Sequence, residues 1–88
     1  MVSKTVKVVN SQGFHMRPAT MFVNEMMKFD SDINLVCGDK KANAKSLMMI
    51  VAAAFKCGME VDVQADGPDE EAALAKAVEL IEDGLGED

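Results

Sequence analysis

Residues 59–66 alternate strictly between apolar side chains at odd positions and acidic residues or Gln64 at even positions. Successive side chains of a β-strand point to opposite faces of its sheet. The pattern therefore predicts a strand with one buried and one solvated face, which is typical of antiparallel sheets. Such a sheet needs cover on its apolar face only, so we expect helices on one side of it.

The first thirty residues contain a strand and then a helix. Residues 2–9 also alternate and predict a strand, which the turn-forming residues 10–13 would end. Pro18 is compatible only with the first turn of the helix that follows, where its missing N–H does no harm. The helix is therefore expected to begin beside His15. Its apolar stripe holds Ala19, Phe22, Met26 and Phe29.

The middle of the chain predicts a hairpin and a second helix. Residues 33–37 alternate as a strand, and Gly38-Asp39 predicts a tight turn into a short strand at residues 40–44. Ser46 is a natural N-cap for an apolar helix over residues 47–55. Cys57-Gly58 would close that helix.

A third helix follows the strand at residues 59–66. Its first turn is acidic, which the helix dipole favours. Gly84 and Gly86 would let its end fray.

The predicted order is β-α-β-β-α-β-α, an α+β fold with a four-stranded, mainly antiparallel sheet and three helices on one face. A ferredoxin-like domain is the competing architecture, since its order lacks only the final helix. The expected core face of the third helix holds Leu74, Ala77, Leu80 and Ile81.

The composition fits one small domain over residues 1–88, with 49% apolar residues. The N-terminal residues lack the long apolar run of a secretory signal or a membrane span, so we expect a cytoplasmic protein. Cys37 and Cys57 have neither CxxC nor zinc-ligand spacing, and we interpret them as buried free thiols.

The net charge of −6 is unevenly distributed. Residues 1–45 carry seven Lys or Arg against four Asp or Glu, a net +3, whereas residues 46–88 carry two against eleven, a net −9. The basic part suits a phosphate-handling surface, and the acidic part is interpreted as a solvated face. The negative total and the absence of Trp and Tyr argue against nucleic-acid binding.

His15, the only histidine, precedes the predicted helix start. Backbone N–H groups and the positive end of the helix dipole stabilise an anion there, and Arg17 adds donors that match phosphate. Imidazole is also a competent nucleophile. The residues thus indicate a site that accepts and releases a phosphoryl group; the alternative is a solvated histidine without a role.

A family resemblance supports the phosphoryl site. Residues 13–19, Gly-Phe-His-Met-Arg-Pro-Ala, resemble the Gly-x-His-x-Arg-Pro-Ala signature of HPr, the histidine phosphocarrier of the bacterial phosphoenolpyruvate-dependent sugar phosphotransferase system. Residues 43–48 are similar to the second motif of this family, and residues 66–71 and the chain length also agree. The resemblance implies an open-faced β-sandwich of four strands and three helices.

The resemblance also implies a mechanism. His15 would take a phosphoryl group on Nδ1 from Enzyme I and pass it to the A domain of a sugar permease, with Arg17 stabilising the phosphate. The protein would be a stoichiometric phosphocarrier and not an enzyme, without cofactor or metal. It would act as a monomer and would not insert into a membrane.

Ser46 has two interpretations. One is a plain N-cap. The other comes from the resemblance: HPr kinase/phosphorylase phosphorylates this serine in many relatives, and a catabolite-control transcription factor is then a further partner. Phosphate at a helix N-terminus would be tolerated by the fold, yet its charge would lie in the partner surface.

The eight methionines are many for this length. We prefer flexible core filling for them, and the alternative is an adaptable apolar patch that docks several partners. Met16, Met49, Ala54 and Phe14 depart from the commoner family pattern and leave the partner set open. The surface that the resemblance implies for partners holds Met16, Thr20, Asn24, Met27, Leu47, Met48 and Met49.

Two other functions compete with the carrier. The first is an HPr-like protein of a regulatory phosphorelay, which would signal by binding and not transport sugar. The second is a small ferredoxin-like enzyme such as an acylphosphatase, which would leave His15 and the motif at residues 43–48 unexplained.

Overall fold

The computed structural model describes residues 1–10 and 13–86. The predicted turn at 10–13 therefore lies partly outside the described residues. No helix within the described parts is long and apolar enough to cross a membrane. The elements follow in the order β1 (Val2–Lys7), α1 (Met16–Met26), β2 (Asp32–Cys37), β3 (Lys40–Asn43), α2 (Leu47–Ala53), β4 (Glu60–Asp66), α3 (Glu70–Glu82) and the 3-10 turn η1 (Gly84–Gly86).

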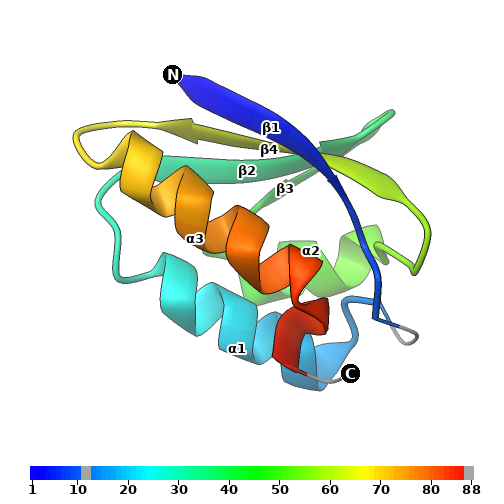
Figure 1. Ribbon diagram of the computed structural model, residues 1–88. Coiled ribbons are helices and arrows are strands. Elements are labelled where there is room, and N and C mark those ends of the chain that lie inside the picture. Colours follow the sequence, from blue (N-terminus) through cyan, green and yellow to red (C-terminus); the bar gives the residue numbers. More distant parts are fainter. Residues whose placement is uncertain (11–12, 87–88) are drawn as a thin grey trace.

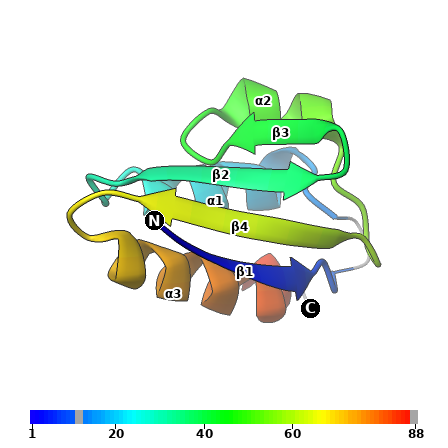
Figure 2. The ribbon, with the colours of Figure 1, turned by 90° about the horizontal axis from the view of Figure 1, so that it is seen from above.

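The four strands form one antiparallel sheet in the order β1-β4-β2-β3. The register pairs Val6 with Val61 and Leu35 with Val63, so apolar side chains of adjacent strands share one face. All three helices lie on that face (Figure 1), and the view onto the sheet shows its other face uncovered (Figure 2). The predicted open-faced architecture is confirmed, and α3 excludes the ferredoxin-like order.

The core lies between the sheet and the helices. The β4 side chains predicted to face inward, Val61, Val63 and Ala65, are fully buried. Burial of a valine side chain such as Val61 or Val63 stabilises the fold by about 1.5–3 kcal/mol. The predicted stripe of α1 is also confirmed at its buried positions, whereas Phe29 lies beyond the helix and is half-buried.

The predicted core face of α3 is partly wrong. Ala77 and Ile81 are buried as expected, but Leu74 and Leu80 are only half-buried. Ala73 is fully buried and Val78 almost fully, although neither was predicted. The helix packs against the edge strand β1 and against β4, so the residues on the side facing these two strands are the buried ones.

The ends of two helices also differ from prediction. The second helix was expected to reach residue 55 and close at Cys57-Gly58, but α2 ends at Ala53, with Ala54 as a left-handed C-cap at φ 54°. Past Glu82, where the third helix was expected to fray, the chain forms η1 from Gly84, and Leu85 within it is buried.

Two predictions about sulfur side chains are wrong. Cys37 and Cys57 are free thiols, but Cys37 is only half-buried and Cys57 is exposed. Core filling describes Met26, which is fully buried, but fails for the four exposed methionines beyond the N-terminal residue: Met16, Met27, Met48 and Met49. An amphipathic stripe does not fix how a helix is oriented, so a methionine at its border can be left in solvent.

Candidate functional site

His15 is the N-cap residue of α1. Its backbone is extended, with φ −80° and ψ −178°, and its carbonyl oxygen accepts the N–H of Ala19 at 3.0 Å. The first N–H groups of a helix have no acceptor within it, and Pro18 has no N–H to be satisfied. The helix start thus lies beside the imidazole, as predicted.

The loop before His15 is fixed by its packing. The buried Asn10 side chain donates to the Gly13 carbonyl oxygen at 2.6 Å, and the Phe14 N–H donates to the Phe55 carbonyl oxygen at 2.9 Å. Gly13 has φ +64°, and a Cβ there would overlap the Phe55 carbonyl oxygen and lie 2.9 Å from the Lys56 Cα. Only glycine therefore permits this close approach of the two segments.

The ring of Phe14 anchors the start of α1 to the core. It meets Phe22 edge-on, with ring centroids 5.3 Å apart, and Phe55 at 5.9 Å. Aromatic pairs with this geometry add about 0.5–1.5 kcal/mol beyond burial. The backbone that carries His15 is consequently held on both sides by well-packed residues.

The His15 ring is half-buried, with its Nδ1 atom covered from solvent, whereas Arg17 is exposed. Arg17 lies in the first turn of α1, where a guanidinium and the helix N-terminus both favour an anion. A phosphoryl group at Nδ1 would require the imidazole to turn about its side-chain bonds, because that atom is covered.

Two adjoining hollows lie beside His15. The first, of about 310 Å³, is lined by His15 and Lys56 among others. The second, of about 270 Å³, is almost wholly apolar and lies between the start of α1 and one side of α2. Met16 and Val51 line both. The first is lined by Phe14, His15, Met16, Val51, Ala54, Phe55 and Lys56, and the second by Met16, Leu47, Met48, Val51 and Ala52.

The second sequence motif meets the first at these hollows. Ser46 is the N-cap of α2, as predicted, and its hydroxyl oxygen accepts the Met49 N–H at 3.3 Å. Asn43 and Lys45 hold the preceding turn, since the Asn43 Oδ1 accepts the Lys45 N–H and the Lys45 Nζ donates to the Phe29 carbonyl oxygen at 2.6 Å. Ser46 thus lies beside the apolar surface that continues from His15.

The residues expected to form a partner surface are mostly accessible. Leu47 is half-buried, and the other six are exposed. Of the seven, only Met16, Leu47 and Met48 line the hollows beside His15, while Met49 lines a different one with Lys40 and Lys41. The Thr20 hydroxyl donates to the Met16 carbonyl oxygen at 2.7 Å.

Sequence reasoning missed Lys56, Val51 and Ala52, which line these hollows. No local pattern indicates them, because only the packing of α1 on α2 brings them to His15. Lys56 supplies a second cation on the His15 side of the molecule.

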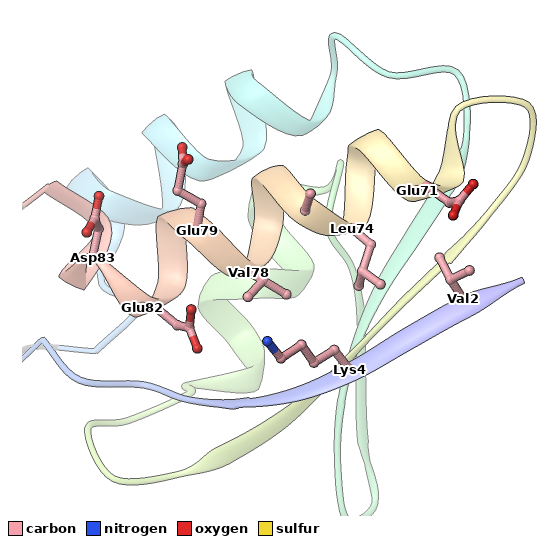
Figure 3. Close-up of a pocket in the computed structure, with 9 residues that line it drawn as sticks. Val2, Lys4, Glu71, Leu74, Val78, Glu79, Glu82 and Asp83 are labelled. Carbon is pink, nitrogen blue, oxygen red and sulfur yellow. The ribbon is translucent and has the colours of Figure 1, made fainter.

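A further hollow of about 520 Å³ lies between β1 and α3 (Figure 3). Lys4 reaches into it from β1, and Leu74 and Val78 face it from α3. Its rim carries four carboxylates: Glu71, Glu79, Glu82 and Asp83. Repulsion by these groups makes it unsuitable for a phosphoryl group. Within the described residues no set of three His, Cys, Asp or Glu is placed to hold a metal ion.

An open-faced α+β sandwich with its one histidine at a helix N-terminus is what the sequence resemblance implies for a small phosphocarrier. The family model for the PTS HPr component phosphorylation site matches residues 2–83. The phosphocarrier protein HPr of Treponema pallidum is 43% identical over the full length of both chains.

Comparison with solved structures gives the same family. A crystal structure of HPr from Thermoanaerobacter tengcongensis has a TM-score of 0.94 and 41% identity, and covers 100% of this chain and 99% of its own. The catabolite repression protein Crh of Bacillus subtilis, described as a swapped dimer, has a TM-score of 0.76 and 39% identity, with 96% and 97% covered. The chain belongs to the HPr family of phosphocarrier proteins of the sugar phosphotransferase system. It is therefore a phosphocarrier and not a catalyst.

Proposed function

We propose that the protein accepts a phosphoryl group on His15 from phospho-Enzyme I and passes it to the A domain of sugar permeases. The observation that carries this proposal is the position of His15 as N-cap of α1. Helix N–H groups and Arg17 stabilise the bound phosphate without enclosing it, so the group can leave again. A carrier that bound phosphate tightly would not release it.

Transfer between two proteins needs close contact around the reacting atoms. The apolar hollow lined by Met16, Leu47 and Met48 offers a docking surface next to His15. Apolar area of this kind is covered on association, while Arg17 and Lys56 suit acidic partners. A cytoplasmic site of action fits this role, because Cys37 and Cys57 are free thiols.

The test is the intact mass of the protein after incubation with phosphoenolpyruvate and Enzyme I. We expect one acid-labile phosphoryl group on the parent protein and none on His15→Ala, because the substitution removes the nucleophile. Addition of a permease A domain should then remove the group from the parent. A phosphorylated His15→Ala protein would contradict the assignment of His15.

We further propose that phosphorylation of Ser46 by an HPr kinase/phosphorylase regulates the carrier. Ser46 caps α2 and adjoins Leu47 and Met48, which line the apolar hollow. Two added negative charges there would be tolerated by a helix N-terminus but would oppose an acidic partner.

We expect Ser46→Asp to weaken binding to Enzyme I about tenfold, measured by isothermal titration calorimetry. Ser46→Asn is the matched control, since it keeps a capping side chain of similar size without the charge. Equal affinities of the two variants would refute a charge effect at Ser46.

A regulatory role is the second candidate, which the likeness to Crh favours. In that case the protein would act by binding a catabolite-control transcription factor. A pull-down with such a factor and with a permease A domain separates the two functions.

A further inference from the structure

Four methionines beyond the N-terminal residue have largely exposed side chains, with exposed fractions of 83% for Met48, 61% for Met27, 59% for Met16 and 44% for Met49. Singly exposed apolar residues are normal on a protein surface, but four long flexible ones around α1 and α2 are not required by the core. The thioether sulfur differs from other apolar groups because it is readily oxidised.

Two of these four side chains lie next to the phosphoryl-transfer site. Met16 and Met48 line the apolar hollow between α1 and α2, and Met16 follows His15 directly and lines the His15 hollow as well. The other two lie elsewhere: Met27 is the C-cap of α1, and Met49 faces the hollow beside Lys40 and Lys41. Exposure is thus similar for Met16 and Met27, but their surroundings differ.

We propose that Met16 and Met48 are sites of reversible oxidation by peroxide, and that their sulfoxides block docking of the phosphoryl-transfer partners. The inference rests on the proposed function, because it takes the apolar hollow as the docking surface. It adds a redox control of transfer to the proposed control at Ser46.

The chemistry is a two-electron oxidation of sulfur. The thioether attacks one oxygen of hydrogen peroxide, the O–O bond breaks, and the products are methionine sulfoxide and water. The reverse step uses a methionine sulfoxide reductase and a dithiol, which is oxidised to a disulfide while the oxygen leaves as water.

The physical effect follows from the surroundings. A sulfoxide carries a strongly polar S–O bond, and a partner that covers it must remove its hydrating water without offering a hydrogen bond. The hollow has apolar walls from Leu47, Val51 and Ala52, so it supplies no such bond either. We expect oxidation at Met16 and Met48 to slow phosphoryl transfer at least about tenfold.

The experiment compares two double variants with the parent: Met16→Leu with Met48→Leu, and the matched control Met27→Leu with Met49→Leu. Each removes two exposed thioethers and keeps similar volume and apolarity. All three proteins carry Cys57→Ser, because Cys57 is exposed and reacts with peroxide too. They are oxidised with hydrogen peroxide, treated with dithiothreitol to reduce remaining thiol products, and mapped by peptide mass spectrometry.

The readout is the rate of phosphoryl transfer from Enzyme I after oxidation divided by the rate before it, within each protein. A change in the basal rate of a variant therefore cancels. We expect this ratio to fall in the parent and in the control variant, to stay near one in the Met16→Leu, Met48→Leu variant, and to recover in the parent after sulfoxide reductase.

Each other result overturns the inference. A parent that carries both sulfoxides and transfers at its original rate would refute it while leaving the proposed function intact. Equal losses in the two double variants would show that Met16 and Met48 are not the responsive sites. A parent that is not phosphorylated before oxidation would remove the proposed function and the inference together.

Discussion

Arg17 is the residue closest in sequence to His15 that can neutralise a phosphoryl group. It lies in the first turn of α1 with its side chain exposed. The sequence alone suggested its role, because the helix start and the spacing to His15 are local features. The covering of the His15 Nδ1 atom was not predictable, since it depends on residues from other segments.

We expect Arg17→Ala to slow phosphoryl transfer about tenfold to a hundredfold in both directions, because the transferring group loses a charge-assisted hydrogen bond. The free energy of unfolding should change by no more than about 1 kcal/mol, because the side chain is exposed and interactions at exposed charges contribute little. Rapid-quench kinetics with Enzyme I and with a permease A domain measure both directions. Rates equal to those of the parent would exclude Arg17 from the mechanism.

At the scale of the element, α2 shows both a confirmed and a missed prediction. Its start at Leu47 after the Ser46 cap was predicted, because capping is a short-range effect. Its end was missed, because Ala54 adopts the left-handed conformation usually taken by glycine. The following backbone then enters the segment where Phe55 accepts the Phe14 N–H.

This C-cap predicts that Ala54→Gly stabilises the protein by about 1 kcal/mol. The left-handed conformation costs an L-residue with a Cβ about 1–2 kcal/mol, and part of the gain is lost to the greater entropy of unfolded glycine. Urea denaturation measures the change. Ala52→Gly is the matched control within α2 and should destabilise by about 1 kcal/mol. A destabilised Ala54→Gly protein would contradict the observed backbone conformation.

At the scale of the whole molecule, Asp69 joins two loops that are distant in sequence. Its carboxylate accepts hydrogen bonds from the Ser31 hydroxyl, from the Asp30 N–H at 3.0 Å and from the Ser31 N–H at 2.9 Å. The Ser31 oxygen in turn accepts the Asp69 N–H at 3.2 Å. The segment between α1 and β2 is thereby fixed to the start of α3.

These hydrogen bonds, that of the Ser31 hydroxyl above all, hold the pKa of Asp69 below its ordinary value. The folded state therefore binds fewer protons at this carboxyl than the unfolded chain does. The stabilisation is present above the unfolded pKa of about 4 and is lost as the pH falls through the folded pKa.

We expect Asp69→Asn to lower the free energy of unfolding at neutral pH and to flatten its decline below about pH 4, because the titrating group is gone. Urea denaturation at a series of pH values measures both. Asp39→Asn, in the exposed β2–β3 turn, is the control for the loss of one carboxylate without loss of the Ser31 contact. Parallel curves for Asp69→Asn and the parent would refute the linkage.

The sequence by itself determined the order of the elements, the one-sided sheet, the helix start at His15 and the cap at Ser46. These features follow from periodicity and from contacts within a few residues, which the chain specifies locally. The resemblance to the HPr family was likewise found in short stretches of sequence, and the match over residues 2–83 confirmed it.

Only the tertiary structure decided which side chains meet. The packing of α1 against α2 placed Lys56 and Val51 beside His15 and left Met16 and Met48 in solvent. Cys57, which was expected to be buried, lies on the surface. The contact of Asp69 with Ser31 likewise joins residues far apart in sequence. Burial and contact depend on how each helix is rotated about its own axis and where it packs on the sheet. The apolar stripe of a helix does not specify that rotation closely enough to decide which residues at its border are buried.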